Sequence, residues 1–205
     1  MWTMPTRQGT ERRTVILRAA GQLFLARGYA GVSMEDVLHA VGGSKSTLYR
    51  HFADKAELFR SAVEALLDEK SAPLRSFTPE DADVAATLVA LGRHFATIVL
   101  DPSSIALHRL VTAEAERIPG IGQAFFEHGP AFGQAVLGRY LQSAADQGLI
   151  RIADARAAGA QLYQAMLGDP QMRLLTNSPS RPAPSEVEHS ITTAVDVFLH
   201  GTLVR

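Results

Sequence analysis

Apolar residues recur at helical spacing along nearly the whole 205-residue chain, and no stretch alternates apolar and polar residues long enough to make a convincing strand. In the first segment Ile16, Ala20 and Phe24 lie four apart on one face of a helix, expected over about 11–27 and ended by Gly28. With 46% hydrophobic and 20% charged residues, the chain can bury a substantial core. The sequence therefore predicts an all-α fold.

The first quarter of the chain carries strong signals for helix starts and stops. Ser33 followed three positions later by Asp36 forms a capping box, and the pair Gly42-Gly43 ends that helix after about two turns. Ser44 is placed to cap a third short helix, expected to run through His51. This segment is therefore predicted to be two short helices joined by a glycine turn, the layout of a helix-turn-helix.

The rest of the chain is expected to form longer helices. A fourth starts after Asp54 and is ended by Pro73. Because proline lacks the amide proton and clashes with the preceding turn, Pro130 and the stretch 168–170 are expected to break or kink the helices that contain them. The Ser- and Pro-rich stretch 178–185 is expected to be a mobile loop. The later helices are expected at about 81–100, 103–117, 121–147, 154–175 and 186–200.

The second short helix offers polar side chains on its outer face. Leu48 and Phe52 lie four apart and are expected to face the core. In a helix-turn-helix the second helix enters the major groove of DNA with its N-terminal residues toward the base edges. For Tyr49, a place in the core is the alternative. The side chains left for solvent or DNA are Lys45, Ser46, Thr47, Tyr49, Arg50 and His51.

Charge is distributed unevenly along the chain. The first 55 residues carry 8 basic and 4 acidic side chains, whereas the remaining residues carry 12 and 17. A basic first quarter in a chain of net charge -1 indicates an anionic partner that docks there. Ordinary variation of surface charge is the alternative.

Composition excludes several classes of protein. The chain has no cysteine, which excludes disulfides, thiolate nucleophiles and cysteine-ligated metals. Its longest stretch without charged residues is 12 residues, 157–168, against the roughly 18–20 that cross a bilayer, so no membrane association is expected. Residues 1–13 contain no apolar signal-peptide core, and we expect a cytoplasmic protein.

An enzyme is the main alternative class, and the motifs that would support it are incomplete. The string Gly42-Gly43-Ser44-Lys45-Ser46 lacks the glycine that a phosphate-binding loop needs directly before its lysine. No Gly-x-Ser-x-Gly elbow occurs, and the seven histidines form no His-x-x-x-His pair. We expect no catalytic residues, no metal site and no cofactor.

The first 60 residues resemble the TetR/AcrR family of bacterial transcriptional regulators. The similarity runs from Ile16-Leu17-Arg18-Ala19-Ala20 through Leu23-Phe24 and Gly28-Tyr29 to residues 44–52, Lys55 and Leu58. It implies double-stranded DNA as the partner, with base-edge contacts from Lys45 and Ser46, flanked by Arg50 and His51. The phosphate contacts that it implies come from Ser33, Thr47, Tyr49 and Lys55.

A weaker similarity covers the C-terminal part. Residues 109–119 and 125–130 resemble the subset of that family with AefR-like C-terminal domains. The resemblance implies a DNA-binding domain over 1–55, a linker helix over 54–70 and a larger helical effector-binding and dimerisation domain over 56–205. The implied function is a ligand-responsive regulator, predicted to be a repressor; the alternative is a DNA-binding regulator without a small-molecule effector.

Bulky and polar residues in the long C-terminal helices suggest a ligand pocket. A pocket wall needs an apolar lining and a few polar groups that orient the ligand. The lining expected here suits a small hydrophobic or aromatic effector held by one or two hydrogen bonds. Its candidates are Leu91, Phe95, Ile98, His108, Val111, Phe125, Phe126, Tyr140 and Tyr163.

The last two helices are the predicted dimer interface. An apolar stripe of Ile191, Ala194, Val195 and Phe198 in the final helix could pack across a two-fold axis as part of a four-helix bundle. The alternative is that this stripe packs within its own subunit. A homodimer with recognition helices about 34–36 Å apart would bind a palindromic operator.

Overall fold

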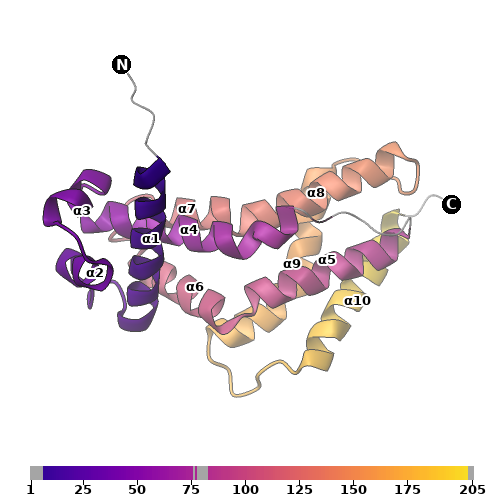
Figure 1. Cartoon of the computed structure of the whole chain (residues 1–205). Helices are drawn as coiled ribbons and strands as arrows, with labels where there is room; N and C mark the ends of the chain where they lie inside the picture. Colours follow the sequence, from indigo (N-terminus) through magenta and orange to yellow (C-terminus); the bar gives the residue numbers. More distant parts are fainter. Residues whose placement is uncertain (1–6, 76, 78–82, 203–205) are drawn as a thin grey trace. The chain divides into compact units, whose positions relative to one another are not determined.

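The computed structural model describes residues 7–75, 77 and 83–202, and these residues form ten helices and no strand (Figure 1). The all-α fold class is confirmed. The helices are α1 (Arg7–Arg27), α2 (Met34–Val41), α3 (Lys45–His51), α4 (Lys55–Arg75), α5 (Val84–Val99), α6 (Pro102–Glu114), α7 (Ile121–His128), α8 (Pro130–Asp146), α9 (Ala155–Leu175) and α10 (Pro184–Thr202).

The chain divides into two compact units. The first comprises the described parts of Met1–Glu69 with Arg109–Phe125, and the second those of Lys70–His108 with Phe126–Arg205. Helices α4 and α6 each contribute residues to both units. The domain boundary between residues 55 and 56 stays a prediction, because compact units do not by themselves delimit functional domains.

Local side-chain chemistry positions α2 as the sequence predicts. The Ser33 hydroxyl oxygen accepts from the Asp36 amide at 3.1 Å, and the Asp36 carboxylate accepts from the Ser33 amide at 2.7 Å. This reciprocal capping box confirms the predicted helix start. Gly42 and Gly43 have φ angles of 66° and 100°, a region that favours glycine, so the chain turns sharply there.

Aromatic and aliphatic residues form the core of the first unit. The ring centroids of Phe24 and Phe59 are 4.9 Å apart in an edge-to-face arrangement, and Tyr29 lies 5.0 Å from Phe59. Leu48 is 2% exposed and Phe52 is 1% exposed. Both are therefore core residues, as predicted from their spacing.

The second unit depends on a very close approach of α8 and α9. A Cβ atom added at Gly159 would lie 2.6 Å from the backbone nitrogen of Gly138, so this crossing has no room for a side chain. Helix α10 packs against α9 and α5, and its Ile191 and Val195 are 1% and 2% exposed. Helices α8, α9 and α10 therefore contribute to one hydrophobic core.

Proline interrupts the helical structure at one of the two places predicted and not at the other. α7 ends at His128 and α8 begins at Pro130, so the break predicted there is confirmed. The helix does not end around residue 170, because α9 continues through Pro170 to Leu175, so the predicted break is wrong there and a kink stays a prediction. Pro170 cannot donate to the carbonyl of Met166 four residues earlier. The Ser190 hydroxyl of α10 donates to that carbonyl at 2.9 Å and replaces the missing hydrogen bond.

The end of one helix and the state of one loop also differ from the sequence prediction. α4 continues past Pro73 to Arg75, so this proline lies inside the last turn of the helix and does not end it. The loop over 178–185 is anchored, since the Arg173 guanidinium donates to the Ser180 carbonyl at 2.9 Å and to its hydroxyl at 2.8 Å.

Among the helices that the structure describes, none alone is long and apolar enough to cross a membrane; only α5 and α6, bent by 65°, pass that test as a pair.

Substitution of Gly159 by Ala should destabilise the protein by about 1–3 kcal/mol, because the new methyl group meets backbone atoms that cannot move aside independently. Gly168→Ala in the same helix is the matched control. The nearest atom to its added Cβ is Gln164 Oε1 at 3.9 Å, so that variant should gain about 0.5–1 kcal/mol. Urea unfolding of both variants measures the difference; equal midpoints would contradict the close helix crossing.

Candidate nucleic-acid interface

The N-terminus of α3 is ordered by three hydroxyl groups. Ser44 caps the helix, and its oxygen accepts from the Thr47 amide at 3.2 Å. The hydroxyls of Ser46 and Thr47 each lie 2.9 Å from the Ser44 hydroxyl. The predicted cap is confirmed, and it gathers the hydroxyls of two predicted DNA-contact residues at the start of the helix.

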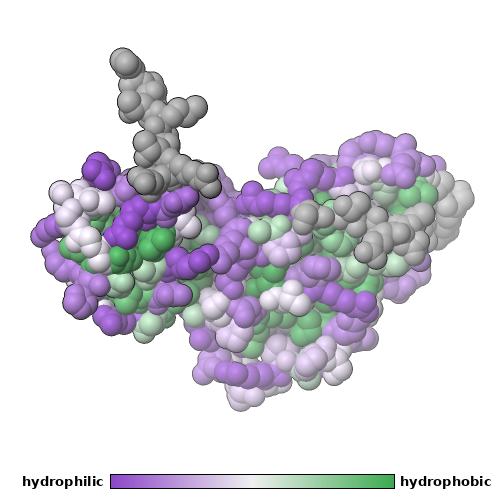
Figure 2. Space-filling view, in the orientation of Figure 1, coloured by the Kyte–Doolittle hydropathy of each residue, from purple (hydrophilic) through white to green (hydrophobic). Residues whose placement is uncertain are grey.

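The outward face of α3 is polar and carries an exposed aromatic ring. Tyr49 is 41% exposed, so the alternative that it is a core residue is wrong. Lys45, Ser46 and Arg50 are also exposed, whereas Leu48 faces inward. In the space-filling view hydrophilic residues rim the α1–α3 region, with hydrophobic residues between them (Figure 2).

Lys45 is held by an acidic residue that sequence analysis missed. Its Nζ lies 2.7 Å from Glu35 Oε1 in α2 and 5.7 Å from the centre of the Tyr49 ring. Hydrogen bonding to Glu35 raises the pKa of Lys45, and the same bond lowers the pKa of Glu35. The two residues are ten positions apart on separate helices, and no local spacing rule brings them together.

Lys55 lies at the start of α4, against an aromatic ring. Its Nζ is 4.1 Å from the centre of the Tyr29 ring, a cation–π contact. Ser33, the other predicted phosphate contact outside α3, is exposed at the start of α2. The structure thus places these two residues at helix starts within the same unit as α3.

Two arginines of α1 also support this motif. The Arg12 guanidinium donates to the carbonyl oxygen of Gly42 in the turn between α2 and α3. Arg13 lies 5.2 Å from the centre of the Phe52 ring and donates to the Ser61 hydroxyl at 3.2 Å. The sequence analysis counted these charges without giving them a position. In the structure Arg12 contacts the turn between α2 and α3, and Arg13 contacts Phe52, the residue after α3.

His51 ends α3 in a positively charged environment. Burial is the main cause that lowers its pKa below the ordinary value, and the charge of Arg50 adds to that effect. Arg13 and Arg12 act in the same direction. His51 is therefore neutral at pH 7 and can both donate and accept hydrogen bonds.

The residues predicted to line a ligand pocket are divided between the two units. Leu91, Phe95 and Tyr163 lie in the core of the second unit, where the Phe95 and Tyr163 rings are 5.4 Å apart. Ile98 and Tyr140 pack against the same core. Val111 and Phe125 belong to the first unit, and the common lining therefore stays a prediction.

Three of the predicted lining residues differ in environment. Burial raises the pKa of Tyr163 to about 12, and its ring lies where a Cβ at Gly133 would be only 2.7 Å from it. Burial lowers the pKa of His108, so that ring is neutral at pH 7. Phe126 is 52% exposed and lines a surface groove of about 630 Å³ beside α8 and the start of α9.

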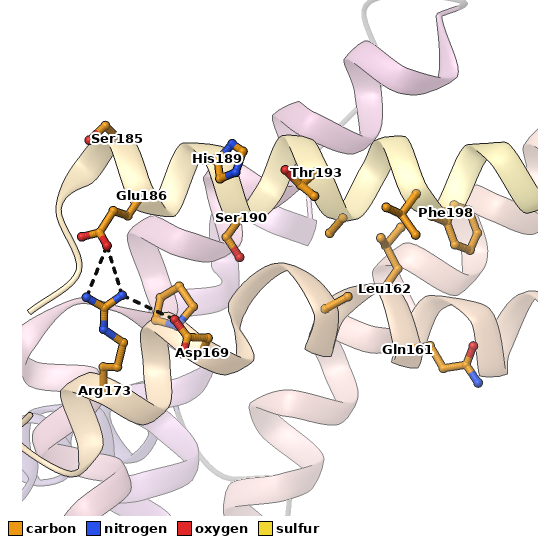
Figure 3. Close-up of a pocket in the computed structure, with 14 residues that line it drawn as sticks. Gln161, Leu162, Asp169, Arg173, Ser185, Glu186, His189, Ser190, Thr193 and Phe198 are labelled. Carbon is orange, nitrogen blue, oxygen red and sulfur yellow. Dashed lines mark hydrogen bonds and ion pairs between the residues drawn. The ribbon is translucent and has the colours of Figure 1, made fainter. Parts of the chain in front are cut away.

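A larger groove of about 750 Å³ runs between α9 and α10 (Figure 3). Arg173 closes one end of it, 3.5 Å from the Asp169 carboxylate and 3.3 Å from that of Glu186 (Figure 3). The stripe predicted for dimerisation is only partly at this surface. Ile191 and Val195 are buried within the subunit, which corrects that prediction for these two residues. The apolar lining consists of Leu162, Ala165, Pro170, Ala194, Val197 and Phe198.

Capped helices α2 and α3, with an exposed basic and hydroxyl-rich face on α3, define a helix-turn-helix protein. The chain belongs to the TetR family of bacterial regulatory proteins, whose family model matches residues 16–62. Residues 86–201 match the AefR-like transcriptional repressor C-terminal domain. Among the residues that the structure describes, no group of three metal-ligating side chains comes together.

Curated relatives match only part of the chain. The transcriptional activator FasR of Mycolicibacterium smegmatis is 38% identical over 58 residues, 28% of this chain and 26% of FasR. The regulator TcmR of Streptomyces glaucescens is 33% identical over 121 residues, 56% of this chain and 53% of TcmR. The chain thus spans from about a quarter to about half the length of these two relatives.

Solved structures match over nearly the whole chain. A TetR-family regulator structure from Mesorhizobium loti MAFF303099 has a TM-score of 0.80 and 28% identity, covering 97% of this chain and 100% of that one. The flavonoid-responsive regulator FrrA has a TM-score of 0.78 and 25% identity, covering 96% and 99%. The fold of each part of the chain is therefore that of this family.

Proposed function

We propose that this protein is a ligand-responsive repressor that binds a palindromic operator as a homodimer and is released by a small hydrophobic or aromatic compound. The observation that carries the DNA-binding part is the outward face of α3, where Lys45, Ser46, Tyr49 and Arg50 are exposed. Burial of Leu48 keeps that face outward. The protein acts in the cytoplasm, where a bacterial operator lies.

The chemistry of this face divides its residues into two roles. Lys45 and Ser46, at the N-terminal end of α3, are proposed to contact base edges. Arg50 and His51 flank them at the other end. Hydroxyl and ammonium groups bind phosphate oxygens and set the register on the duplex. The proposed phosphate contacts are Ser33, Thr47, Tyr49 and Lys55.

Duplexes selected from random DNA by the protein test this proposal. Lys45→Ala should weaken binding to the selected duplex by about 1–3 kcal/mol and relax its sequence preference, because a base-edge contact is lost. Tyr49→Phe should weaken binding to every duplex by about 1 kcal/mol, because only a phosphate contact is lost. Arg181→Ala, which removes a positive charge in the second unit, is the control and should match the parent. Unchanged affinity of Lys45→Ala for the selected duplex at moderate salt would show that Lys45 does not contact the bases.

The groove between α9 and α10 is the proposed homodimer surface. Val197, which lines this groove among other apolar residues, is 67% exposed, and exposed apolar patches are typical of interaction surfaces. Two copies of the α9–α10 pair packed across a two-fold axis would form a four-helix bundle. Such a dimer presents two copies of α3, which suits an operator with two half-sites.

Val197→Glu should shift the protein toward monomer, because two carboxylates would be placed in or beside an apolar interface. Leu149→Glu is the control: Leu149 is 41% exposed and lies in the turn between α8 and α9, outside the groove. Light scattering over a concentration series measures both variants. A dimer that is equally stable in the parent and in Val197→Glu would exclude this surface.

An aromatic effector is supported by the composition of the second unit and by one relative. Phe95 and Tyr163 provide aromatic surface, and neutral His108 provides a hydrogen-bonding ring. FrrA, which matches along nearly the whole chain, is described as flavonoid-responsive. The description of the C-terminal family model as a repressor domain supports repression rather than activation.

Operator and effector should weaken each other's binding by the same factor, because linkage between two sites is reciprocal. We expect a flavonoid, with naringenin as the first probe, to bind with lower affinity when the selected duplex is present. Calorimetric titration with and without the duplex measures both values. Equal flavonoid affinity in the two titrations would contradict release by this ligand class. DNA binding unaffected by any compound of an aromatic panel would favour a regulator without an effector.

A further inference from the structure

An acidic residue contacts the first residue of the proposed recognition helix. Glu35 is the second residue of α2, and Lys45 is the first residue of α3. Lys45 Nζ lies 2.7 Å from Glu35 Oε1, and the two side chains are 63% and 61% exposed. The ion pair is therefore on the surface, on the helix that the proposed function directs toward DNA.

The neighbouring carboxylate, that of Asp36, makes different contacts, so the role of Glu35 can be separated from that of the helix cap. Asp36 closes the capping box with Ser33 and lies 3.5 Å from Arg27. The carboxylate of Glu35 takes no part in that cap and reaches across to α3 instead. A negative charge beside a DNA-binding lysine opposes binding to a polyanion, so its presence at this position calls for a functional explanation.

We propose that Glu35 is a specificity-determining residue, which holds Lys45 until a base-edge acceptor of the correct sequence replaces the carboxylate. The inference rests on the proposed DNA-binding function. On a correct site, two acceptors such as guanine O6 and N7 compensate Lys45 for the lost partner. On a wrong site Lys45 has no such acceptor and keeps Glu35 as its partner. The cost of breaking the ion pair is then borne mainly by the correct complex, so Glu35 lowers the affinity for the correct site more than for a wrong one.

The exchange is feasible because the pair is accessible to water. An exposed ion pair contributes little net stability, so the carboxylate can be displaced by a ligand with better geometry. Lys45 also lies 5.7 Å from the centre of the Tyr49 ring, a second contact on its own helix. The lysine is thus positioned by two neighbours without being buried.

Glu35→Gln tests this role, because glutamine keeps the shape of the side chain and removes its charge. Glu69→Gln is a closely matched control: Glu69 pairs with Arg18 at 3.4 Å, and both side chains are 62% exposed. Affinities are measured at several salt concentrations for a duplex selected by the parent protein and for a scrambled duplex of the same composition. Melting temperatures of both variants show whether folding is preserved.

We expect Glu35→Gln to bind the selected duplex about fivefold more tightly and the scrambled duplex less than twofold more tightly, so that discrimination rises roughly threefold. Glu69→Gln should keep the parent's discrimination. The double variant Glu35→Gln with Lys45→Met should discriminate to the same extent as Lys45→Met alone, because the carboxylate acts through that lysine.

Three results would overturn the inference. Equal tightening on both duplexes would mean simple charge repulsion, weaker binding to the selected duplex would mean that Glu35 only positions Lys45, and behaviour identical to Glu69→Gln would mean no role. Failure of the DNA-binding proposal is distinguishable from all three. In that case the parent protein itself selects no sequence from random DNA.

Discussion

Burial of Leu48 and Phe52 is the contact on which the orientation of α3 depends. A helix of seven residues is too short to be stable alone in water, so packing must hold it in place. Because these two side chains are at most 2% exposed, the opposite face of the helix is left to solvent. The Ser44 cap and the glycine turn before it set where the helix begins. The exposure of Lys45 and Tyr49 follows from these constraints.

The second unit depends on a different feature, glycine residues whose lack of a side chain lets two helices pack closely. Gly138 and Gly159 bring the backbones of α8 and α9 together, and α10 packs against α9 and α5. The bond from Ser190 to the Met166 carbonyl compensates for Pro170, so α9 stays continuous along the groove proposed for dimerisation. A hydroxyl on a neighbouring helix thus satisfies the carbonyl that the proline leaves without its helical donor.

Fewer basic side chains of the first 55 residues are free to contact a partner than the residue counts suggest. Some basic residues of the first 55 are engaged within the protein: Arg12 donates to the turn between α2 and α3, and Arg13 lies against Phe52. An excess of positive charge in the sequence therefore overstates the charge free to meet phosphates. The Glu35–Lys45 pair is an example in which an acidic neighbour can control a basic group that points toward a partner.

The sequence alone determined the features that depend on neighbours along the chain. The capping box at Ser33, the cap at Ser44 and the inward spacing of Leu48 and Phe52 were all predictable, because capping and helical periodicity act over three or four residues. Tertiary structure decided the features that depend on a second helix. The partner of Lys45, the continuity of α9 through Pro170 and the burial of Ile191 and Val195 each require an atom from a distant segment. Side-chain packing across helices carries no fixed spacing in sequence, and for that reason these features emerged only from the folded chain.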